Sequence, residues 1–157
     1  MQLLGIILLA AATLSTTNIK LPGGKTLKVE VATSPEDVGK GLIGRESLPA
    51  DSGLLLVYKG DVQTQYNFMG YRFPVDVLYI DENKTIINLK QNAVPCRTAD
   101  CHYPSIWPYR YALQLPAGTV KRLNIHGGDV LSFDGPWVSP VYGANSTPKA
   151  PIRLTLP

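Results

Sequence analysis

The strongest structural signal in the chain is residues 75–81, where nearly every position is apolar, β-branched or aromatic. Such a run predicts a short strand that is buried on both faces. Pro74 marks its beginning, because proline cannot donate to a β-ladder and is tolerated at the first residue of a strand. Asp76 interrupts the apolar pattern, since a period of two puts it on the same face as Leu78 and Ile80. A carboxylate on an apolar face needs a hydrogen-bond donor or a cation, so we expect Asp76 to have a buried partner.

The frequency of turn-forming residues favours β-structure for the rest of the chain. Its 157 residues include 14 glycines and 13 prolines, which is typical of many short elements joined by turns. The length is sufficient for one core but not for two. We therefore expect a mainly β (α+β) fold, with a compact antiparallel sheet or barrel-like domain and two short helices. Residues 16–135 would form this single globular domain, and residues 136–157 an extended tail that can add an edge strand at 152–156.

Hydrophobic periodicity and capping residues locate the individual elements. Alternation in residues 26–32 predicts a half-buried strand. Further strands are expected at residues 54–58, 62–68, 85–89, 109–115 and 130–133. A first helix would begin with Ser34 as its N-cap and Pro35 at its first position, and a second would span residues 119–123. Residues 92–108 form the longest segment without a regular pattern.

The N-terminus has the character of a secretory signal. Residues 3–14 are apolar or small, but they are too few for a membrane span, which needs about 20 residues. Residues 1–15 fit a signal peptide cleaved after Ala12 or Ser15, although they contain no lysine or arginine. A buried N-terminal strand is the alternative. We expect no integral membrane span and an exported protein, whether periplasmic, extracellular or part of the cell envelope.

The two cysteines support export. Cys96 and Cys101 are separated by four residues in a loop-like segment, and a close isolated pair in an exported protein usually forms a disulfide. The alternative is a metal site that recruits His102 and His126. Because this spacing matches no zinc pattern well, we expect a disulfide and no metal.

Four segments follow one another in a distinctive order. They are residues 41–49 with 53–57, residues 68–69 with 74–76, residues 93–96 with Cys101, and residues 111–113 with 116–118 and 128–129. In this order and spacing they resemble the domain of unknown function 192 family, small prokaryotic proteins that are often exported. The resemblance covers about residues 29–133. It implies a compact, mostly antiparallel β domain with short helices, and it implies no specific activity.

One segment departs from this family pattern. The family usually has Trp-Met-Lys-Asn-Thr where this chain has Phe-Met-Gly-Tyr-Arg at residues 68–72. The lysine, asparagine and threonine side chains are therefore missing here. A site that depended on those three side chains would be lost in this protein.

Arg45 and Asp76 form the most specific candidate site. A turn arginine and a carboxylate entering a buried strand could make a bidentate ion pair. Such a pair would either stabilise the fold or form one wall of a small pocket, with Met69, Tyr71 and Arg72 at its mouth.

Charge and motifs restrict the possible functions. The formal net charge of +3 comes from scattered lysines and arginines, which argues against a nucleic-acid partner. No phosphate loop, dinucleotide fingerprint or nucleophile motif is present, so no cofactor is expected. The favoured function is a non-catalytic binding or interaction module of the cell envelope, a monomer whose partner is an unknown small molecule or an envelope protein. The alternative is a small hydrolase or lyase that uses Asp76 with Arg45 or a histidine.

Overall fold

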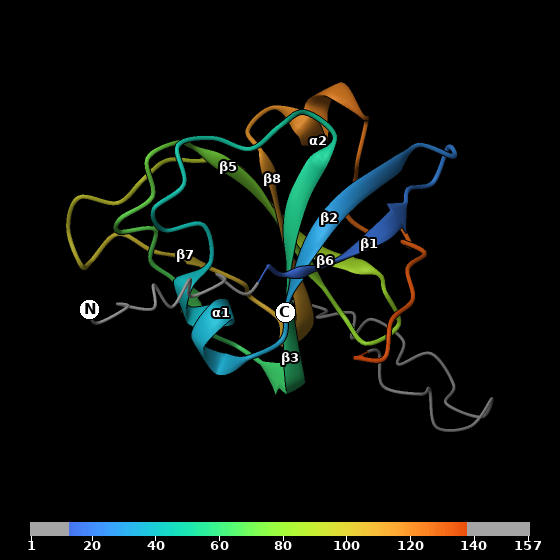
Figure 1. The fold of residues 1–157 in the computed structure, drawn as a ribbon, viewed down its shortest axis with the longest axis horizontal. Coiled ribbons are helices and arrows are strands. Elements are labelled where there is room, and N and C mark those ends of the chain that lie inside the picture. The colour runs from blue at the N-terminus through green and yellow to red at the C-terminus, as the bar shows by residue number, and fades with distance from the viewer. Residues whose placement is uncertain (1–12, 138–157) are drawn as a thin grey trace, which may run out of the picture.

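The protein is built on one six-stranded sheet (Figure 1). The structure is a computed structural model that describes residues 13–137. In sheet order the strands are β1 (Ser15–Lys20), β2 (Thr26–Ala32), β3 (Ser52–Val62), β8 (Tyr109–Pro116), β5 (Val75–Ile80) and β6 (Ile86–Ala93). A two-stranded sheet contains β4 (Gln65–Tyr66) and β7 (Tyr103–Pro104), and the helices are α1 (Pro35–Lys40) and α2 (Thr119–Arg122). The mainly β fold with two short helices is thus confirmed.

The large sheet is mostly antiparallel. Of the strand pairs described, only β2 with β3 is parallel, and α1 lies in the connection between these two strands. A parallel pair needs a crossover, and the short helix provides it. This connection places α1 beside one face of the sheet, where the candidate site described below is located.

Each face of the sheet carries its own hydrophobic cluster. Along β3, Leu55 and Val57 belong to one cluster, whereas Leu54 and Leu56 belong to the other. The alternation follows from the period of two along a strand. All six residues of β5 are buried, so the expectation of a strand covered on both faces is confirmed.

The segment after α2 connects the two ends of the large sheet. Lys20, at the end of β1, exchanges two backbone hydrogen bonds with Ser132, of 2.8 and 3.0 Å. Thr85, just before β6, forms a β-bridge with Val130. The strand expected at residues 130–133 is therefore present only as isolated bridges. These bridges satisfy backbone groups near both edge strands and close one end of the sheet.

Several strand boundaries differ from the prediction. The expected break at Lys59 is wrong, because β3 continues to Val62 through a register shift against β8. A bulge of this kind lets exposed polar residues stay extended without matching the partner strand. The strand expected at residues 62–68 is reduced to β4 (Gln65–Tyr66), and β1, which lies beyond the apolar run of residues 3–14, was not predicted. Ile19 is the one buried side chain of β1, too weak a signal to predict a strand.

Helix α1 begins as its sequence predicts. The Ser34 side chain accepts a hydrogen bond of 3.0 Å from the Asp37 amide, and Pro35 occupies the first turn. The helix ends at Gly41, whose φ of +51° and ψ of −125° suit a residue without a Cβ.

Two expectations lie largely outside the described residues. The proposed signal peptide falls on residues 1–15, of which 1–12 are not described, and the proposed tail with its edge strand falls mostly on residues 138–157. Within residues 13–137, no helix has the length and apolar character needed to cross a membrane.

Candidate functional site

Asp76 and Arg45 do not form the predicted pair. Asp76 is completely buried, and its two carboxylate oxygens accept hydrogen bonds from the amides of Asn92 (2.8 Å) and Val120 (2.9 Å). The predicted need for a buried donor is thus met by the backbone. Arg45 instead makes a bidentate ion pair with Glu30 on β2.

The partners of Asp76 give it a structural role. Gly118, the N-cap of α2, has no side chain to cap the helix. The Asp76 side chain on β5 caps it instead, by accepting a hydrogen bond from the Val120 amide in the first turn. Asn92 has a φ of +50° where the pairing of β5 with β6 shifts register. A carboxylate suits both positions because each of its two oxygens accepts a hydrogen bond from one backbone amide.

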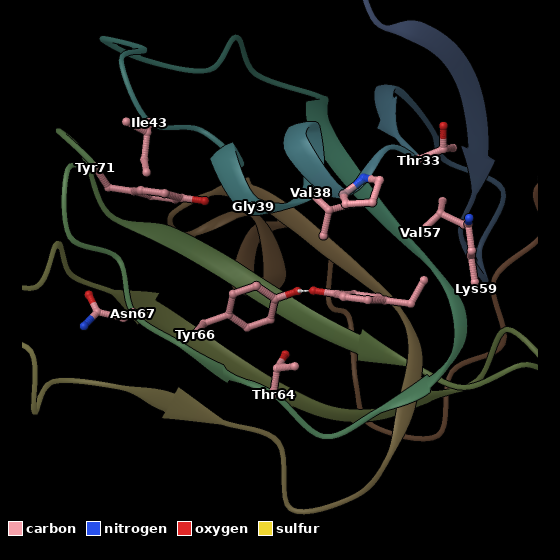
Figure 2. A pocket seen from close by; sticks show the side chains of 12 residues that line it. Thr33, Val38, Gly39, Ile43, Val57, Lys59, Thr64, Tyr66, Asn67 and Tyr71 are labelled. Atoms are coloured by element: carbon pink, nitrogen blue, oxygen red, sulfur yellow. Dashed lines mark hydrogen bonds between the residues drawn. The ribbon is translucent and has the colours of Figure 1, made fainter.

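The candidate site of this protein is a pocket between α1 and strands β3 and β4 (Figure 2). Its volume is about 590 Å³. Its walls are largely aliphatic and aromatic, formed by Thr33, Pro35, Val38, Gly39, Ile43, Val57, Tyr58, Lys59, Thr64, Tyr66, Asn67 and Tyr71. Neither Asp76 nor Arg45 is among these lining residues.

Tyr71 is the one predicted site residue that lines the pocket. Its hydroxyl accepts a hydrogen bond of 3.1 Å from the Leu42 amide and donates one of 2.8 Å to the Gln114 side-chain oxygen. Burial is the main cause that raises the pKa of Tyr71. The hydroxyl is therefore a fixed link between the end of α1 and the sheet, while its ring faces the pocket.

Met69 and Arg72 lie on the surface away from these walls. The Met69 side chain is 46% exposed, and Arg72 forms an exposed ion pair with Glu46. Gly70, between Met69 and Tyr71, has a φ of +83°. The backbone therefore turns between the exposed Met69 and the pocket-lining Tyr71.

Two tyrosines that the sequence analysis missed lie at the centre of the pocket. The hydroxyls of Tyr58 and Tyr66 are 2.5 Å apart and share a hydrogen bond. Burial is the largest cause that raises the pKa of Tyr58 to about 12, and it also raises the pKa of Tyr66. Both hydroxyls therefore keep their protons at neutral pH. The hydroxyls of Thr64 and Tyr109 neighbour this pair and share a hydrogen bond with each other, so the four hydroxyls form one polar cluster.

The other polar side chains of the pocket wall differ in whether they already have hydrogen-bond or ion-pair partners. Thr64 shares a hydrogen bond with the buried Tyr109 hydroxyl. The Asn67 side chain accepts from the Met69 amide (2.8 Å) and donates to the Ala99 carbonyl (3.3 Å). Lys59 is exposed at the rim, and within residues 13–137 it takes part in no ion pair.

The predicted disulfide is confirmed. Cys96 and Cys101 are bonded, with a distance of 5.6 Å between their Cα atoms. Such a bond indicates an oxidising compartment. His102 and His126 belong to no metal-binding cluster, since the described part of the chain contains no group of three or more His, Cys, Asp or Glu side chains that could hold a metal.

Comparisons with known proteins agree with this fold. The model of the family DUF192, described as Uncharacterized ACR, COG1430, matches residues 17–133. A crystal structure described as a "putative transcription regulator" from Sinorhizobium meliloti 1021 is 30% identical, with a TM-score of 0.72, and the match covers 79% of this chain and 98% of that one. A protein of unknown function from Novosphingobium aromaticivorans is 21% identical, with a TM-score of 0.67, over 78% of this chain and 94% of that one. No curated protein matches the chain.

Proposed function

Because the chain belongs to the DUF192 family, whose description assigns no reaction, we propose its function from the pocket: a non-catalytic binding domain that takes up a small molecule. The observation that carries this proposal is the pocket of about 590 Å³ with mainly apolar walls. Ligand sites are commonly concave, apolar and roughly 300–1,000 Å³ in volume, with a few polar groups that orient the ligand.

The positions of the titratable groups favour binding over catalysis. The hydrolase or lyase alternative needed Asp76 in a cleft with Arg45 or a histidine. Asp76 is instead completely buried with both oxygens bonded to backbone amides, and Arg45 is paired with Glu30. The two hydroxyls at the centre of the pocket belong to Tyr58 and Tyr66, and burial raises the pKa of both. A tyrosine that holds its proton so firmly is a poor general base at neutral pH.

Export is the second part of the proposal. The disulfide fits an oxidising compartment, and residues 1–15 have the composition of a signal peptide. Cleavage after Ala12 would leave β1 intact, whereas cleavage after Ser15 would remove its first residue. We therefore favour cleavage after Ala12 and a monomer that works in the periplasm, in the cell envelope or outside the cell.

The basic side chains do not favour DNA binding as a second function, despite the description of the Sinorhizobium protein. Within residues 13–137, ion pairs with carboxylates occupy six of the thirteen lysines and arginines, Lys25, Arg45, Arg72, Lys84, Arg110 and Arg122, and the other seven are scattered along the sequence of a chain whose formal net charge is only +3. A nucleic-acid surface needs clustered basic groups that are available to phosphates.

Filling the pocket tests the proposed function. Figure 2 shows the Val38 side chain pointing from α1 toward Tyr66, so Val38→Phe should occupy the pocket space. The probe is N-phenyl-1-naphthylamine, a neutral apolar dye whose fluorescence rises when it leaves water. Val130→Phe is the matched control, because Val130 is 59% exposed and does not line the pocket.

We expect the parent protein and Val130→Phe to bind the dye and Val38→Phe to bind it at least about tenfold more weakly, a loss of about 1.4 kcal/mol of binding free energy. Thermal unfolding of the three proteins checks that they remain folded. Equal dye binding by the two variants, or no binding by the parent protein, would contradict the proposal.

A further inference from the structure

The geometry of the pocket points to a class of ligand: we propose that it binds an organic anion with an elongated apolar body, and that Lys59 binds the anionic group. This inference rests on the proposed function, since it names the chemistry of the molecule that the pocket takes. It concerns which ligands the pocket prefers, and this preference is tested separately from the question of whether the pocket binds a ligand at all.

Lys59 gives the pocket its charge. Among the described residues that line the pocket it is the only charged one, and it is exposed at the rim. Asp61, two residues further along β3, is bound to Arg110 at 2.9 Å. That carboxylate is thus already paired. An incoming anion would find a lysine without an ion-pair partner among residues 13–137.

The pocket has two unlike ends. Figure 2 shows Ile43 and Tyr71 at one end and Thr33 and Lys59 at the other, with Tyr66 between them. An apolar body at the first end would bury hydrocarbon against aliphatic and aromatic side chains. Its anionic group would then reach the second end. A ligand with one apolar end and one charged end matches this order of side chains.

The polar groups of the wall disfavour a sugar or another polyhydroxyl ligand. Such a molecule needs many unpaired donors and acceptors, but the Asn67 amide is used by Met69 and Ala99. The Tyr58 and Tyr66 hydroxyls bond to each other, and the neighbouring Thr64 hydroxyl bonds to Tyr109. The wall therefore provides one cation and few free hydrogen-bonding groups.

Three ligands with one common body test the charge preference. The probes are 5-phenylpentanoate, 5-phenylpentanol and 5-phenylpentylamine, measured by displacement of N-phenyl-1-naphthylamine at pH 7.5. They differ only in a terminal group that is negative, neutral or positive. The variant is Lys59→Met, which keeps an unbranched side chain and removes the charge. The matched control is Lys28→Met, an exposed lysine of β2 that does not line the pocket.

We expect the carboxylate to bind at least about threefold more tightly than the alcohol, a ratio within the range of an exposed ion pair, and the amine to bind most weakly. Lys59→Met should abolish the carboxylate preference without weakening the alcohol, and Lys28→Met should keep it. High salt should reduce the preference in the parent protein because the pair is exposed. Equal affinity for alcohol and carboxylate, or a preference that survives Lys59→Met, would overturn the inference.

The design separates this inference from the proposed function. If the dye and the alcohol bind but the carboxylate has no advantage, the pocket binds ligands and only the anion preference is wrong. If neither the dye nor any of the three ligands binds the parent protein, the proposed function and the inference both fail.

Discussion

At the scale of single residues, Asp76 links three parts of the fold. Its side chain leaves β5, caps α2 through Val120, and holds the irregular backbone of β6 through Asn92. The sequence could predict that Asp76 needs a buried donor, because a charged residue interrupts an apolar strand. It could not identify the donor. Backbone amides are present at every residue and leave no mark in the sequence, whereas Arg45 was visible as a cation.

Replacement of Asp76 by asparagine should destabilise the fold by about 2–3 kcal/mol. Asparagine has one acceptor oxygen where aspartate has two, and its NH₂ group would face one of the two backbone amides. Urea unfolding followed by circular dichroism measures the free energy of unfolding. Asp134→Asn is the control, since the Asp134 side chain is 97% exposed, and it should change stability by less than about 0.5 kcal/mol. Equal stability of the two variants would show that the Asp76 hydrogen bonds contribute little.

At the scale of elements, the sequence predicts helices and central strands better than edges. The first helix has a strong capping pattern, and β5 and β8 are continuous runs of buried residues. Edge strand β1 has only one buried side chain, and the short β4 and β7 depend on pairing between distant segments, which a period of two cannot reveal. The pocket was missed for the same reason. Tyr58 and Tyr66 look like ordinary strand residues until β3 and β4 place their hydroxyls together.

The end of α1 should be sensitive to a single methyl group. A Cβ at Gly41 would clash with the Tyr71 hydroxyl, so Gly41→Ala should destabilise the protein. Tyr71→Phe removes that hydroxyl, and a double-mutant cycle should show that Gly41→Ala costs at least about 1 kcal/mol less in this background. The measurement is urea unfolding of the parent, both single variants and the double variant. Strictly additive costs would mean that the positive φ of Gly41, rather than the clash, sets the penalty.

The disulfide should stabilise the loop between β6 and β7. Closing the short ring between Cys96 and Cys101 should contribute roughly 2 kcal/mol, so the double variant Cys96→Ala/Cys101→Ala should lose about that amount. The Cys96 amide also donates to the Phe68 carbonyl, which ties this loop to the segment that leads into Tyr71. Urea unfolding with and without dithiothreitol tests the prediction. The reductant should lower the stability of the parent protein and leave the variant unchanged; a parent that is insensitive to reduction would contradict it.

At the scale of the whole molecule, buried tyrosines are distributed over both faces of the sheet. Tyr58, Tyr66 and Tyr79 lie on the face of the pocket, and Tyr111 lies in the opposite cluster. Burial is the main cause that raises the pKa of each of the four. The folded protein therefore contains several phenol groups that stay protonated at a pH where an unfolded tyrosine would ionise. This property follows from the closed, two-sided core and not from any one residue.

These tyrosines should make the protein unfold in alkali. Unfolded tyrosine has a pKa of about 10, whereas the pKa of folded Tyr58 is about 12, so the unfolded chain releases protons first. Stability should be complete below pH 10 and should fall as the pH rises from about 10 to 12. For Tyr58 the loss should be on the order of 1–3 kcal/mol, because its pKa is raised from about 10 to about 12. Urea midpoints between pH 8 and pH 12, with absorbance at 295 nm for phenolate, measure both quantities.

The two signals should change together, because Tyr79 and Tyr111 are almost completely buried and can ionise only when the sheet opens. In Tyr58→Phe one raised pKa is absent, and the decline of the urea midpoint above pH 10 should be shallower than in the parent protein. Full phenolate absorbance near pH 10 from a protein that is still folded would show that solvent reaches these hydroxyls. The pocket would then be more open than its packed tyrosine rings indicate, and the apolar surface available to a ligand correspondingly smaller.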